Sequence, residues 1–292
     1  MDYLLQWGID LIIAIQQVHG PVLDSVFRAI TSVGGEEFYL LFIPLFYWCI
    51  DLGMGARLAI LLLISSWLNI NLKDLLQHPR PFDLDQTVML SSVGGYGLPS
   101  NHAQAAVVLW GSIAFWGHKT WLWVIAIALT ILIGFSRVYL GVHFPTDVLA
   151  GWAIGIILLG IYLSGNLSIS KILLRLNLWQ QILLALVLPV ALLLIHPVNS
   201  TTSAMGTLAG AGLGLALMHR YVHFKAGGLW FYRVLRFIIG SIVVFAIYMG
   251  LSTFYPGEES AFYLVFRYLH YGLIGLWVSL GAPWLFLKLK LN

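Results

Sequence analysis

Charged residues are scarce in this chain. They make up 9% of its 292 residues, against roughly 25% in an average soluble domain. Hydrophobic residues make up 60%. These proportions exclude a soluble globular protein and a disordered chain. Because about 20 apolar residues are enough to cross a bilayer as a helix, the composition predicts an integral membrane protein with several spans.

Cysteine is almost absent as well. Cys49 is the only one, which excludes an internal disulfide and a zinc site built from cysteines. The formal net charge of +3 is too small to indicate nucleic acid as a partner. Residues 3–18 are apolar, but no basic segment precedes them and no small-residue cleavage site follows, so we expect no signal peptide.

The long apolar segments lack the alternation of apolar and polar residues that a membrane β-barrel requires, so each is predicted to be a helix. The fold class that follows is all-α, a polytopic transmembrane helical bundle with about nine spans. The predicted spans are 36–50, 55–77, 99–117, 120–137, 145–164, 178–195, 203–219, 231–254 and 262–287.

The first 35 residues have a different pattern. Polar residues recur there at helical spacing: Gln6, Asp10 and Gln17 before Pro21, and Asp24, Arg28 and Ser32 after it. Two amphipathic helices that lie in the membrane interface fit this pattern. A short span over 3–18 is the alternative. The predicted division is therefore 1–35 as interfacial helices, 36–196 as a core of six spans, and 197–292 as an extension of three spans.

Lysine and arginine collect on one predicted face of the membrane, for example Arg57, Lys119, Arg220, Lys225 and Lys288. Acidic residues collect in the loops of the other face: Glu36, Glu37, Asp83, Asp85, Glu258 and Glu259. The excess of positive charge predicts that the first face is cytoplasmic. The second face is then periplasmic, extracellular or lumenal.

Three polar clusters interrupt the apolar pattern, and all three fall on the predicted outer face. In the first, Lys73 and Arg80 are seven residues apart and share one side of a helix until Pro79 and Pro81 end it. His78 lies between the two cations and could contact a substrate.

The second cluster is Pro99-Ser100-Asn101-His102, which follows a loop rich in glycine. Pro99 suits the first position of a helix. Ser100 and His102 would then stand at a helix N-terminus, where free N–H groups favour an anion.

The third cluster begins with Ser136 and Arg137 and continues with His143 and Asp147. The last two are four residues apart across a helix start that Pro145 marks. A carboxylate at that distance can hold an imidazole in one tautomer.

Together the clusters offer cations and backbone donors, which suit the oxygens of a phosphoryl group in transfer. A histidine that a carboxylate orients is a candidate nucleophile, and a second histidine is a candidate acid. Few carboxylates lie near the cations, and these basic groups would repel a divalent ion. We therefore expect neither a metal nor another cofactor.

The three spacings, K-x6-R-P, P-S-x-H and S-R-x5-H-x3-D, resemble the motifs of the type-2 phosphatidic acid phosphatase superfamily, over about residues 20–165. The resemblance implies that His143 attacks phosphorus to form a phosphohistidine and that Asp147 orients it. His102 would protonate the leaving alcohol and then activate water. The implied phosphate ligands are Lys73, Arg80, Ser100 and Arg137.

Asn101 stands where many members of this family carry glycine, and its backbone N–H still suits phosphate binding. The run at 97–104 is more similar to the sphingosine-phosphate phosphatase branch than to the diacylglycerol-phosphate branch. The resemblance makes 36–196 the phosphatase core. Arg267 lies inside the last apolar segment, and an intramembrane arginine is a candidate accessory residue.

The predicted function is hydrolysis of a lipid phosphate monoester or an isoprenyl diphosphate on the outer face, through a phosphohistidine and without a metal. A lipid phosphotransferase with the same site is one alternative, and a lipid transporter or flippase that retains the motif is another. We expect a bacterial inner (plasma) membrane as the location, with the site facing the periplasm or the exterior. The predicted partner is a membrane lipid substrate; which lipid, and which oligomer, stay open.

Overall fold

The computed structural model describes residues 3–291, apart from the side chains of residues 166–171 and 174. Residues 1, 2 and 292 of the predicted end segments lie outside the described residues. Every element of regular structure in the described part is helical, which confirms the all-α prediction. The helices are α1 (Tyr3–Gln16), α2 (Pro21–Ser32), α3 (Glu36–Cys49), α4 (Leu52–Leu76), α5 (Pro81–Leu84), α6 (Asn101–Gly117), α7 (Thr120–Tyr139), α8 (Pro145–Arg175), α9 (Leu178–Ile195), α10 (Asn199–Leu217), α11 (Trp230–Ser252), α12 (Tyr263–Leu276) and α13 (Ala282–Lys288), with the short turns η1 (Gln86–Val88), η2 (Met218–Val222) and η3 (Trp277–Gly281).

The polytopic character follows from the length and composition of these helices. Among the described residues, seven helical segments are long and apolar enough to cross a membrane. The pair α2 and α3, bent by 47° at the break between them, would make an eighth. The predicted span 99–117 corresponds to α6, which has 17 residues. A bundle of seven to eight spans confirms the predicted fold class and agrees roughly with the predicted nine.

The chain forms two compact units. Unit 1 takes the residues up to Tyr39 together with Leu68–Ser164, and unit 2 takes Leu40–Trp67 and the residues from Gly165 onward. The boundaries therefore fall inside α3, α4 and α8. The predicted division at residues 35 and 196 stays a prediction.

In unit 1, α1 packs its apolar side against α7 and η1. Ile9 and Ile12 are buried with Val138 and Phe144. At the end of α1, the buried amide of Gln16 donates to the carbonyl oxygens of Val88 (2.9 Å) and Tyr139 (2.7 Å). These contacts fix α1 to the ends of η1 and α7, near the loop that precedes α8. The predicted place of α1 in the membrane interface stays a prediction.

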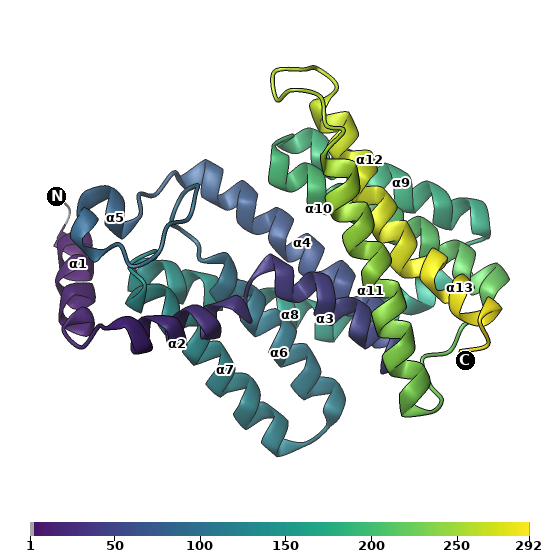
Figure 1. Cartoon of the computed structure of the whole chain (residues 1–292), viewed down its shortest axis with the longest axis horizontal. Helices are drawn as coiled ribbons and strands as arrows, with labels where there is room; N and C mark the ends of the chain where they lie inside the picture. Colours follow the sequence, from purple (N-terminus) through teal and green to yellow (C-terminus); the bar gives the residue numbers. More distant parts are fainter. Residues whose placement is uncertain (1–2, 292) are drawn as a thin grey trace. The chain divides into compact units, whose positions relative to one another are not determined.

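Helix α2 crosses the C-terminal end of α7 in the same unit (Figure 1). Phe27 stacks on Tyr139 with a ring-centroid separation of 4.2 Å, and the Tyr139 hydroxyl donates to Asp24 at 2.6 Å. Arg28 donates to the carbonyl of Leu90 at 2.8 Å. The polar stripe of α2 therefore binds α7 and the loop before α6.

In unit 2, α10 lies beside α12 (Figure 1). A side chain at Gly206 would collide with the carbonyl of Tyr268, and one at Gly210 would collide with the carbonyl of Gly272. Glycine at these two positions therefore lets the two backbones approach closely, as small residues do in membrane helix pairs.

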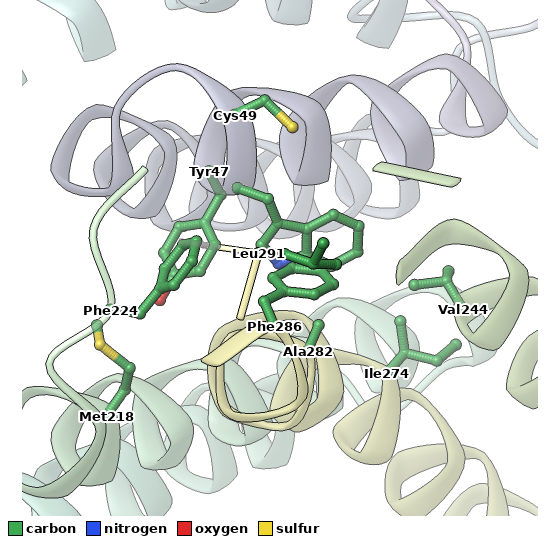
Figure 2. Packing of buried hydrophobic residues seen from close by; sticks show 10 residues of the cluster. Tyr47, Cys49, Met218, Phe224, Val244, Ile274, Ala282, Phe286 and Leu291 are labelled. Atoms are coloured by element: carbon green, nitrogen blue, oxygen red, sulfur yellow. The ribbon is translucent and has the colours of Figure 1, made fainter. Parts of the chain in front are cut away.

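A buried cluster of unit 2 contains several aromatic residues. Figure 2 shows Phe286 of α13 pointing toward α3, which carries Tyr47. The rings of Trp48 and Phe286 meet edge to face at 5.5 Å. Both residues are fully buried, so this contact joins the two ends of the unit's sequence.

Candidate active site

The three polar clusters of the sequence meet in unit 1. Each residue of these clusters lies at the end of a helix or in the loop next to it. The fold brings together residues that are up to 74 positions apart in the sequence. The set comprises Lys73 at the end of α4, Arg80 before α5, Ser100 and His102 at the start of α6, Arg137 at the end of α7, His143 in the next loop and Asp147 in the first turn of α8.

His143 and Asp147 form a buried pair at the centre of this set. The imidazole Nδ1 lies 3.2 Å from the Asp147 Oδ2, and the two residues are 2% and 0% exposed. The same oxygen accepts the backbone N–H of Phe144 at 3.0 Å. Because Pro145 begins α8, Asp147 falls in the first helical turn, where a carboxylate is also favoured by the helix dipole. The carboxylate therefore holds the His143 proton on Nδ1 and leaves the lone pair on Nε2.

The surroundings of His143 favour its neutral form. Burial is the main cause, and the charges of Lys73, Arg137 and Arg80 add to it, so the pKa of His143 lies well below its usual value of 6.5. His143 lies in the loop between α7 and α8. At neutral pH its Nε2 is thus unprotonated, which is the state that a nucleophile needs.

Arg80 is fixed beside His143. Its Nη1 lies 3.4 Å from His143 Nε2 and donates to the carbonyl of Val142 at 2.7 Å. Its Nε and Nη2 donate to the carbonyls of Gly95 (2.6 Å) and Gly94 (2.8 Å). Gly95 has a φ of +72°, which glycine adopts without strain. Three carbonyls therefore hold the guanidinium in place, with its Nη1 toward His143.

Lys73 binds the next two residues of the same glycine-rich loop. Its Nζ donates to the carbonyls of Tyr96 (2.5 Å) and Gly97 (2.9 Å). A Cβ at Gly97 would lie 2.9 Å from Asp147 Oδ2. The loop thus needs glycine at this point because it passes directly against the Asp147 carboxylate.

Two buried donors of the site have no hydrogen-bond partner among the described residues: the Arg137 Nε and the Ser100 hydroxyl. The Arg137 Nη1 donates to the Thr31 hydroxyl at 2.8 Å, and the Ser100 backbone N–H donates to the Asp147 carbonyl at 3.0 Å. Buried polar groups are nearly always paired, so two such donors next to a helix N-terminus can bind an anion.

His102 and Asn101 occupy the first turn of α6. A Cβ at Gly34, in the turn between α2 and α3, would lie 3.1 Å from the His102 ring. His102 follows Ser100 by two residues, and the Ser100 backbone N–H donates to the Asp147 carbonyl, so the start of α6 lies against the first turn of α8. The N-terminal segment thus covers one side of His102.

The two predicted accessory residues, His78 and Arg267, lie in different units and have different partners. His78 lies against Asp147, with its Nδ1 3.4 Å from Asp147 Oδ1. Arg267 belongs to unit 2, where its Nε donates to the Asn199 carbonyl (2.9 Å) and the Ser203 hydroxyl (2.7 Å). An accessory role for Arg267 stays a prediction.

Three further residues support the site and were not predicted from the sequence: Thr31, Asn69 and Gln104. Thr31 binds Arg137. Asn69 donates to the Pro99 carbonyl (3.3 Å) and to the Gln104 side chain (2.8 Å), beneath the start of α6. Asn69 and Gln104 could have been found as polar residues inside apolar helices, whereas Thr31 carries no such signal.

Comparison with known proteins places this site in a family. The family model described as the PAP2 superfamily matches residues 55–171, and the model described as the PAP2 superfamily phosphatase, transmembrane extension, matches residues 202–292. Phosphatidylglycerophosphatase B of Bacillus subtilis is 32% identical over 158 residues, which are 48% of this chain and 74% of that protein. The chain belongs to the PAP2 superfamily. The resemblance of the three motifs is thereby confirmed.

Other PAP2 proteins match a smaller share of their own length. Lipid phosphate phosphatase delta of Arabidopsis thaliana is 31% identical over 185 residues, which are 54% of this chain and 42% of that protein. Sphingosine-1-phosphate phosphatase 2 of Mus musculus is 28% identical over 144 residues, which are 47% of this chain and 40% of that protein. The chain thus spans less than half the length of these two relatives.

A solved structure has the same fold. The crystal structure of the PAP2 type phosphatidylglycerolphosphate phosphatase from Bacillus subtilis aligns with a TM-score of 0.51 at 26% identity and covers 58% of this chain and 89% of that one. A PAP2 phosphatase of known structure therefore shares the helical architecture of just over half of this chain.

Proposed function

We propose that this protein hydrolyses a lipid phosphate monoester or an isoprenyl diphosphate through a phosphohistidine at His143. The observation that carries the proposal is the position of His143. Its Nδ1 is 3.2 Å from the Asp147 carboxylate and its Nε2 is 3.4 Å from the Arg80 guanidinium. A nucleophile, its orienting base and an anion-binding cation are thus in contact.

In the first step, the Nε2 lone pair of His143 attacks phosphorus and the bond from phosphorus to the leaving oxygen breaks. His102 donates its proton to that oxygen, so the alcohol leaves neutral. The His143 ring becomes cationic as the N–P bond forms. Asp147 stabilises this charge through the proton on Nδ1.

In the second step, His102 is neutral and takes a proton from water. The water oxygen attacks phosphorus and the N–P bond breaks, which returns the electron pair to His143 Nε2. Inorganic phosphate leaves, and the proton on His102 restores the starting state.

The phosphoryl oxygens bind to the cations and to the start of α6. Arg137 and Ser100 supply the two buried donors that have no partner among the described residues, and Lys73 and Arg80 add charge. The backbone N–H of Asn101 lies at the helix N-terminus. These donors are fixed before the reaction, which is how an enzyme stabilises charge that develops in a transition state.

A lipid substrate is supported by the relatives, whose names include a lipid phosphate, a phosphatidylglycerophosphate and a sphingosine-1-phosphate phosphatase. It is also supported by α7, which carries Arg137 near its end. Ile127, Ile131 and Phe135 of this helix are exposed. An acyl or isoprenyl chain could lie along these residues while its headgroup reaches the cations.

The proposed site faces the outside of the membrane. Support comes from the distribution of lysine and arginine. Loop 85–98 precedes α6 on the side of the site, and loop 118–119 follows α6 at its other end. Gln86 and Lys119 are both exposed, so they make a matched pair of labelling positions.

With Cys49 replaced by serine, we expect a Q86C variant to react with an impermeant maleimide in intact cells, and a K119C variant to react only after lysis. Both positions belong to unit 1, so they differ in the predicted side of the membrane and not in the structural unit. The opposite labelling pattern would place the site in the cytoplasm.

Phosphate release is expected to need no metal, because Lys73, Arg80 and Arg137 already supply the positive charge. Purified protein in detergent should release inorganic phosphate from a lipid phosphate without an acceptor alcohol, and EDTA should leave the rate unchanged. Vanadate, which mimics five-coordinate phosphorus, should inhibit. Loss of activity in EDTA that magnesium restores would contradict the mechanism, and release that requires an acceptor would favour a phosphotransferase.

A further inference from the structure

His78 has no part in the mechanism above, yet it contacts the catalytic carboxylate. It lies in the loop between α4 and α5, two residues before Arg80. The family motif leaves this position open, because it falls within the x6 of K-x6-R-P. The motif therefore does not specify this contact.

The two oxygens of Asp147 have different partners. Oδ2 lies 3.2 Å from His143 Nδ1 and accepts the Phe144 N–H at 3.0 Å. Oδ1 lies 3.4 Å from His78 Nδ1. In the part of the chain that the structure describes, both Oδ1 and that nitrogen are buried and neither makes a hydrogen bond. Each is thus the polar neighbour available to the other.

We infer that His78 is a positioning residue: its Nδ1–H holds the second oxygen of Asp147 and so fixes the carboxylate toward His143. This inference rests on the proposed function. A carboxylate anchored through one oxygen can turn about its Cβ–Cγ bond. A donor on the other oxygen limits that rotation and satisfies a buried acceptor.

His78 also makes contacts that would serve a purely structural role. Its ring meets Phe144 edge to face at a centroid separation of 5.7 Å, and its carbonyl accepts the Gly97 N–H at 2.8 Å. The backbone bond is available to any residue, and the ring contact needs only an aromatic side chain. The positioning role alone needs the N–H.

Two substitutions separate these roles. His78→Phe keeps an aromatic ring against Phe144 but has no donor. His78→Asn loses the ring but has an amide N–H near the place of Nδ1. His19→Ala is the matched control, because His19 lies in the same unit at 3.9 Å from the carboxylate of Asp24, outside the site.

The experiment measures kcat, KM and the single-turnover rate of phosphoenzyme formation on one lipid phosphate. For His78→Phe we expect kcat and the rate of phosphoenzyme formation to fall about tenfold or more, as for other residues that orient a catalytic group, with KM nearly unchanged. His78→Asn should retain most of the wild-type rate, and His19→Ala all of it. Wild-type kcat in His78→Phe, or equal losses in the Phe and Asn variants, would overturn the inference.

Failure of the inference and failure of the proposed function give different results. A wild-type enzyme that forms labelled His143 while the His78 variants turn over normally refutes the inference alone. A wild-type protein that releases no phosphate refutes both. If His78→Phe is not recovered as folded protein, His78→Ala replaces it: a slow Ala variant beside a fast Asn variant supports the inference, and equal rates contradict it.

Discussion

Replacing His143 with alanine is expected to abolish turnover and to leave no phosphate on the protein. The change removes the one imidazole whose Nδ1 contacts Asp147 and whose Nε2 contacts Arg80. Loss of a nucleophile in a comparable catalytic set costs about 10⁴-fold or more in rate. The measurement is phosphate release from a lipid phosphate, together with the amount of labelled phosphate that remains on the denatured protein.

His102→Ala is the informative comparison. We expect it to slow turnover strongly while some phosphate still accumulates on His143, because in the proposed mechanism His102 acts on the leaving oxygen and on water. His19→Ala, a histidine near a carboxylate outside the site, should behave as wild type. Labelled phosphate trapped on the His143→Ala protein would contradict the assignment of the two histidines.

The second large effect concerns the substrate. A lipid phosphate with a long chain is expected to exceed a soluble monoester in kcat/KM by about two orders of magnitude. Each buried methylene contributes about 0.8 kcal/mol, so four more of them give about 3 kcal/mol, or about 200-fold. The exposed apolar side chains of α7, such as Ile131 and Phe135, offer a surface for the acyl or isoprenyl chain of the lipid next to Arg137.

The assay compares isoprenyl diphosphate, phosphatidate, phosphatidylglycerol phosphate, sphingosine phosphate and glucose 6-phosphate in detergent. Two phosphatidates that differ only in acyl length are the matched control, because they present the same headgroup to the cations. Equal or faster turnover of glucose 6-phosphate would refute the lipid substrate and would leave the phosphohistidine mechanism to be tested separately.

The helices were predictable because long apolar runs have few other stable forms in a membrane. The predicted 36–50 is α3 (Glu36–Cys49), and the predicted 120–137 is α7 (Thr120–Tyr139). The predicted 203–219 begins four residues after α10 does, at Asn199. The polar residues of that first turn concealed the start of the helix.

The proximity of the three clusters was also predictable, since fixed spacings at helix ends place side chains on one face of the membrane. The partners of those side chains were not. Thr31 reaches Arg137, and His78 reaches Asp147, only because loops and helices distant in sequence pack together. Spacing along one segment contains no information about such contacts.

Arg267 illustrates the same limit. The sequence marks an arginine inside an apolar segment but not its partners. In unit 2 those partners are Asn199 and Ser203 of α10, and α10 begins at Asn199, earlier than predicted. The boundary error left Asn199 outside the predicted span, and no spacing within 262–287 relates Arg267 to either partner.

The most direct test of the account is the site of phosphorylation in the wild-type enzyme. Labelled lipid phosphate is added, the reaction is stopped in alkali, which preserves phosphohistidine, and the labelled peptide is identified by mass spectrometry. The account predicts phosphate on His143. Phosphate on His102, or rapid phosphate release with no covalent intermediate on any histidine, would contradict it.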